Sequence, residues 1–128
     1  MATAPNYDNV RLGGPSGLRV PSEAGSAVLA VGKKVTVAQG ALSADTSVNL
    51  NAEQSAASYI EATASGAHAL TLILAAAMPG HLYGVYNHTA NNLILKVGSG
   101  GTGITVATTK RALLVSGDTD IERLSADV

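Results

Sequence analysis

The sequence predicts a mainly β fold: an antiparallel β-sandwich or barrel, jelly-roll-like, with an extended N-terminal arm. Short segments rich in Val, Ile, Leu and Thr recur along the chain. Turn residues (Gly, Asn, Ser and Asp) separate these segments at intervals of about 8–12 residues, which is typical of an all-β domain. The alanine-rich stretches are short, and Pro79-Gly80 ends the longest of them.

Residues 1–26 are expected to form the arm and residues 27–128 the β-domain. Pro5, Pro15 and Pro21 are three of the four prolines, and four glycines share this segment. Because proline fixes φ and glycine loses the most entropy on ordering, no regular element is expected here. The segment is either a disordered tail or an arm that becomes ordered on a partner. The arm's anchors would be its large apolar and aromatic residues, Tyr7, Val10, Leu12, Leu18 and Val20.

The first half of the β-domain contains several strand-like runs and one short helical signal. The runs cover residues 28–31, 35–37, 47–50, 59–63 and 68–74. Asn51, with Gln54 three residues later, is typical of a capping box. One or two helical turns are therefore expected between Ala52 and Ser58.

The second half contains five strand candidates, at residues 82–87, 93–97, 104–106, 111–116 and 120–124. The glycine-rich loop at 98–103 formally satisfies Gly-x-Gly-x-x-Gly. A dinucleotide site needs a helix after that loop, whereas Ile104-Thr105-Val106 is strand-like. Ile104 also stands where a phosphate-binding loop has its lysine. The loop is therefore interpreted as a hairpin connection.

The composition favours a protein that associates with other chains. The chain has 128 residues, no Phe, no Trp and only four Tyr, and its length is that of one domain. A core of small aliphatic side chains must gain its stability from many small contributions. With only 13% charged residues, we expect part of the surface to be buried against further copies or a larger partner.

Charge and cysteine content argue against several classes of function. A net charge of −1 disfavours nucleic-acid binding, which requires a basic face. The absence of cysteine excludes disulfides and fits assembly in a reducing cytosol. No secretory signal is visible, and the apolar stretch at 69–78 is about half of a membrane span, so no membrane contact is expected.

No residues are spaced for catalysis, a cofactor or a metal. His68, His81 and His88 lack a metal-ligand spacing and are expected at the rim of the β-domain. Asp118 and Glu122, with Asp120 between them, alternate and would share one face as solvated charges. No nucleophile elbow is present. We therefore expect no enzymatic activity.

The second half resembles a β-module found near the C-termini of tailed-phage virion proteins, such as head decoration proteins and fibre bases. The order and spacing of thirteen residues carry the resemblance: Pro79, Gly80, Tyr83, Val85, Asn87, Lys96, Gly101, Gly103, Thr105, Val106, Lys110, Arg111 and Ala112.

The resemblance implies a virion structural protein, assembled in the host cytoplasm. The first expectation is a capsid decoration (cement) protein, a homotrimer on the outer surface of the head. Its partner would be the major capsid protein, contacted through Tyr7, Leu12, Leu18 and Val20. The alternative is a short tail fibre, spike or baseplate component. A carbohydrate-binding module ranks lower, because few aromatic residues are available to stack on sugars.

Overall fold

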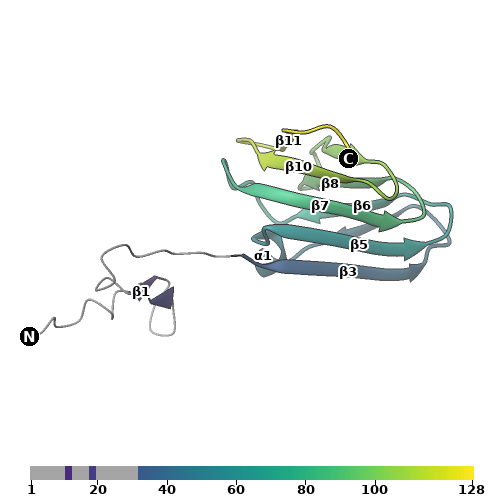
Figure 1. Cartoon of the computed structure of the whole chain (residues 1–128), viewed down its shortest axis with the longest axis horizontal. Helices are drawn as coiled ribbons and strands as arrows, with labels where there is room; N and C mark the ends of the chain where they lie inside the picture. The colour runs from purple at the N-terminus through teal and green to yellow at the C-terminus, as the bar shows by residue number, and fades with distance from the viewer. Residues whose placement is uncertain (1–10, 13–17, 20–31) are drawn as a thin grey trace, which may run out of the picture. The chain divides into compact units, whose positions relative to one another are not determined.

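The computed structural model describes residues 11–12, 18–19 and 32–128 (Figure 1). The chain divides into two compact units, Met1–Val31 and Gly32–Val128. The expected boundary after residue 26 and the expected strand at 28–31 lie outside the described residues. Each unit is described by itself.

In the N-terminal unit, β1 (Arg11–Leu12) pairs antiparallel with β2 (Leu18–Arg19). The register places Leu12 opposite Leu18. The expectation that this segment contains no regular element was therefore wrong at these four residues. A short backbone pairing forms despite the neighbouring Gly and Pro.

The C-terminal unit is built from strands, as the sequence predicts. Its strands are β3 (Lys34–Ala41), β4 (Thr46–Asn49), β5 (Tyr59–Ser65), β6 (Leu70–Leu74), β7 (Leu82–Thr89), β8 (Leu93–Val97), β9 (Ile104–Val106), β10 (Arg111–Ser116) and β11 (Ile121–Arg123). They form a five-stranded sheet in the order β11-β10-β7-β5-β3 and a four-stranded sheet in the order β4-β6-β8-β9. The two sheets pack together, which confirms the mainly β, two-layer fold.

The chain alternates between the two sheets for its first six strands. β3, β5 and β7 lie in the five-stranded sheet, and β4, β6 and β8 follow them in the other sheet. Each two-strand coil therefore stacks on the one before it, and Figure 1 shows β3, β5, β7 and β10 as one layer. In the five-stranded sheet, Val35 pairs with Ile60 and Ile60 with Val85. Each coil thus advances 25 residues.

The strand directions differ from the antiparallel arrangement that was expected. β3, β5 and β7 are mutually parallel, as are β4, β6 and β8. Only β9, β10 and β11 join their sheets antiparallel. The physical reason is that consecutive strands enter different sheets, so that each strand of one sheet provides the crossover that a parallel pair in the other requires.

The core lies between the sheets and consists of small and medium apolar side chains. Residues alternate inward and outward along the strands, as in β6, where Leu70, Leu72 and Leu74 are buried. Leu72 pairs with Leu95 in the next coil, so like residues stack in register. Tyr83 is the largest fully buried side chain.

The short helix α1 (Ala52–Ser55) begins where the sequence predicts. Asn51 Oδ1 accepts from the Gln54 amide, and the Gln54 side chain accepts from the Asn51 amide, which confirms the capping box. The helix ends after one turn, earlier than Ser58. In the part of the chain that the structure describes, no helix is long and apolar enough to span a bilayer.

Candidate functional site

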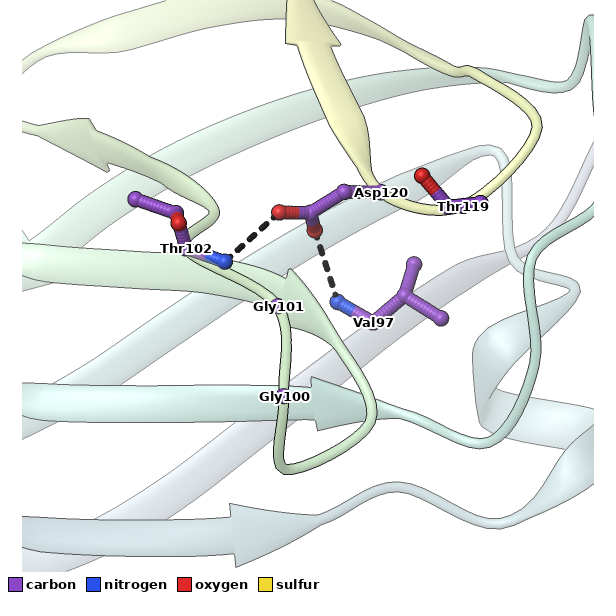
Figure 2. Close-up of a pocket in the computed structure, with 6 residues that line it drawn as sticks. All are labelled: Val97, Gly100, Gly101, Thr102, Thr119 and Asp120. Carbon is purple, nitrogen blue, oxygen red and sulfur yellow. Dashed lines mark hydrogen bonds between the residues drawn. The ribbon is translucent and has the colours of Figure 1, made fainter.

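The glycine-rich loop between β8 and β9 borders a pocket of about 420 Å³. Figure 2 shows the Asp120 carboxylate between the loop and the end of β8. It accepts hydrogen bonds from the amides of Val97 (3.1 Å), Thr102 (2.7 Å) and Gly103 (2.8 Å). A Cβ at Gly101 would lie 2.8 Å from the same carboxylate, so only glycine fits there.

These amides are the type of donor that binds phosphate in a nucleotide site, but here the protein's own carboxylate occupies them. Burial raises the pKa of Asp120, yet the amides of Gly103 and Ile121, with those of Val97 and Thr102, outweigh burial and lower it. β9 follows the loop where a nucleotide site would need a helix. Asp120 therefore acts as a structural clamp, and the expectation that it is a solvated charge was wrong.

Several residues of the motif that carries the resemblance stabilise the core. The buried Asn87 amide group donates to the Asn91 and Val106 carbonyls, and its oxygen accepts from the amide and hydroxyl of Thr89. The Tyr83 hydroxyl donates to the Ser55 carbonyl. These residues hold the fold together and are not available to a ligand.

The outer face of the five-stranded sheet, in contrast, presents reactive polar and aromatic groups to solvent. The Arg111 guanidinium lies over the Tyr86 ring, 3.8 Å from its centroid. On the neighbouring turn of the same strand, His88 stacks on Tyr86 with centroids 5.1 Å apart and ring planes 19° apart. A cation on a tyrosine face is a favourable contact, so the arginine is held flat on the sheet.

A satisfied ion pair lies beside this stack. Lys34 Nζ is 2.7 Å from the Glu61 carboxylate, and His88 Nδ1 is 3.5 Å from it. The hydrogen bond and charge of Lys34 lower the pKa of Glu61. The pair joins β3 to β5 at the outer surface.

Apolar side chains continue the same face toward β11. Tyr59 packs over Gly84, where an added Cβ would lie 3.0 Å from its ring. Gly84 pairs with Leu113, and Leu82 pairs with Val115. Leu113 and Leu82 are 43% and 50% exposed, which makes them two of the most exposed large apolar side chains among the described residues.

The residues singled out from the sequence are not brought together. Leu12 and Leu18 are paired in β1 and β2, whereas Tyr7 and Val20 lie outside the described residues. His81 bonds the Ala57 carbonyl and packs against Tyr83, so it is not a rim residue. Over the ranges that the structure describes, no three acidic or histidine side chains gather as a metal site.

Comparison with known proteins gives no match: no family model, no curated protein and no solved structure matches this chain.

The outer face of the five-stranded sheet is therefore the candidate functional surface. It combines tyrosine, arginine and exposed leucine, the residue types that are enriched at the centres of protein interfaces (Tyr, Arg) or bury apolar area there. Sequence reasoning missed it because Tyr86 and Arg111 are 25 residues apart and meet only through the pairing of β7 with β10. The alternation of outward residues in each strand was visible, but the strand order was not.

Proposed function

We propose that this protein is a structural protein of a tailed-phage virion, a capsid decoration protein that binds and stabilises the outer surface of the head. The observation that carries the proposal is the outer face of the five-stranded sheet, whose side chains suit protein contact. The resemblance of the stretch from Pro79 to Ala112 to virion β-modules supports the same role.

The proposed mechanism is mechanical. Apolar burial and backbone pairing would bridge neighbouring subunits of the major capsid protein and resist the pressure of packaged DNA. The N-terminal arm would contact the capsid through Tyr7, Leu12, Leu18 and Val20, while the β-domain associates with further copies. Ordering the arm costs about 1–2 kcal/mol per residue of backbone entropy, so contacts made on the capsid must offset it.

The test is cosedimentation of the full-length protein with undecorated heads of the phage whose genome encodes it. We expect the wild-type protein to sediment with heads. A variant with Tyr7, Leu12 and Leu18 replaced by Ser should remain in the supernatant. Lys96→Glu, on the outer face of the other sheet, provides a matched surface control and should bind as the wild type does.

Two outcomes contradict parts of the proposal. Sedimentation of the wild-type protein with purified tails and not with heads would replace the head assignment by the fibre, spike or baseplate alternative. Wild-type binding by the triple serine variant would move the capsid contact from the arm to the β-domain.

A further inference from the structure

Two opposite charges without partners lie at the two ends of the apolar part of the outer face. We propose that this face binds the same face of a second copy of the chain around a two-fold axis, so that Arg111 of each copy meets Glu122 of the other. The contact between copies is independent of binding to a phage head, and it is measured on the purified protein.

Arg111 is positioned to bind a carboxylate. Its guanidinium is fixed on the Tyr86 ring at 3.8 Å, and within the described ranges no hydrogen bond or ion pair involves its nitrogens. A planar guanidinium stacked on an aromatic ring keeps its edge N–H donors available, and these donors match a carboxylate in pairs. The neighbouring Lys34 is already paired with Glu61.

Glu122 supplies the matching charge at the other end of the face. It pairs with Val115 across β10 and β11, and directly opposed residues of an antiparallel pair share a face. Its carboxylate lies against Gly117, where a Cβ would collide with it. Among residues 32–128, no hydrogen bond or ion pair is made by this carboxylate.

An apolar row separates the two charges. Leu113, Gly84 and Tyr59 lie side by side on β10, β7 and β5. Arg111 is two residues from Leu113 in one direction along β10, and Val115 is two residues away in the other. Four residues of strand span about 13 Å, so the charges lie on opposite sides of this row.

A two-fold axis through this row, parallel to the sheet and across its strands, makes the face self-complementary. The rotation places the Arg111 side of one copy over the Val115 side of the other, within about one strand spacing of Glu122. Leu82 then faces Tyr86 of the other copy, and Leu113 packs against its own equivalent. An isologous contact makes each pairing twice, and fully covered aromatic and arginine side chains are the usual energetic centre of such contacts.

The two-fold contact is compatible with the three-fold arrangement that the resemblance implies. Copies at three-fold positions of a closed shell have neighbours related by two-fold axes, and this face would pair across such an axis. In solution it predicts that the number of copies in a particle is even.

The test is sedimentation equilibrium of the full-length protein and four variants at micromolar concentration. We expect the wild-type protein to have about twice the 12.8 kDa mass of the chain, or an even multiple of it. Arg111→Glu and Glu122→Arg should each weaken association about 100-fold, because one ion pair worth about tenfold is lost twice. The double variant Arg111→Glu with Glu122→Arg should restore association, since both contacts form again with reversed charge.

The fourth variant, Lys96→Glu, reverses a charge on the outer face of the four-stranded sheet and should associate as the wild type does. The double variant distinguishes a lost contact from a folding defect, because a defect caused by either substitution would persist in it. A wild-type monomer or trimer overturns the proposal. So does a double variant that associates no better than the single ones.

Discussion

The hydroxyl of Tyr83 donates a 2.7 Å hydrogen bond to the backbone carbonyl of Ser55. Both residues are buried, and the bond ties β7 to the last residue of α1. Because the helix has a single turn, this bond and the capping box at Asn51 together fix its position at the corner between β4 and β5.

Tyr83→Phe should lower the free energy of unfolding by about 1–2 kcal/mol, because the buried carbonyl loses its donor while the ring packing is kept. Urea unfolding followed by circular dichroism measures the change. Tyr59→Phe is the matched control, since the Tyr59 hydroxyl makes no hydrogen bond among the described residues. Equal midpoints for Tyr83→Phe and the wild type would show that the bond adds nothing to stability.

Asn87→Ala should be more harmful, with a loss of about 2–4 kcal/mol. The substitution removes a side chain that makes four hydrogen bonds and leaves the Val106 carbonyl and the Thr89 groups without these partners in a buried site. Asn49→Ala, at an exposed position of β4, should change stability by less than about 0.5 kcal/mol. Thermal melts of both variants decide the matter. Similar melting temperatures would contradict a structural role for Asn87.

Asp120→Ala should destabilise the loop between β8 and β9 by about 1–3 kcal/mol, because the amides of Thr102 and Gly103 lose a charged acceptor. Hydrogen exchange of these two amides should accelerate as well. Asp118→Ala, in the same turn, lacks such bonds and serves as control. Unchanged exchange at both amides would mean that the carboxylate does not clamp the loop.

Acid should destabilise the protein through Asp120 and Asp127. Burial raises the pKa of each carboxyl, but for Asp127 the Ala107 amide and Arg123 outweigh it, as the amides do for Asp120, so both pKa values are lowered in the folded state. A group with a lowered folded pKa stabilises the protein above its unfolded pKa, near 3.9, and this stability is lost as the pH falls through the folded pKa. Urea midpoints measured from pH 6 to pH 2 should therefore decrease below about pH 4.

Asp120→Asn should make that decrease shallower, since one of the two groups no longer titrates. Asp118→Asn should leave the slope as in the wild type. An equally steep decrease in the wild type and in Asp120→Asn would exclude Asp120 as a source of the pH dependence.

The sequence predicted the strands well but not their partners. The run from Leu93 to Val97 was bounded correctly, because alternation of apolar residues and flanking turn residues are local signals. The parallel pairing of β5 with β7 was not predictable in this way. Its 25-residue period resides in the backbone register, and the paired residues differ in kind, as Ala62 and Asn87 do.

The candidate surface was hidden for the same reason. Arg111 read alone is a charged residue at the start of a strand, and Tyr86 is one of a few tyrosines. Their contact depends on the antiparallel pairing of β10 with β7, a long-range relation that no short motif encodes. Asp120 was misjudged because its carboxylate turns toward a loop 17 residues away along the chain.

Residues 32–128 alone should fold as the full chain does. Every residue of the core cluster lies within this range, and Gly32–Val128 forms one compact unit. The β-rich circular dichroism spectrum and a cooperative urea transition should both survive removal of residues 1–31, with a midpoint close to that of the full-length protein. A truncated protein that is unfolded or aggregates would show that the N-terminal unit is required for the fold. Retained folding would make the truncated chain a suitable probe of head binding, because any loss of binding would then be caused by the missing arm.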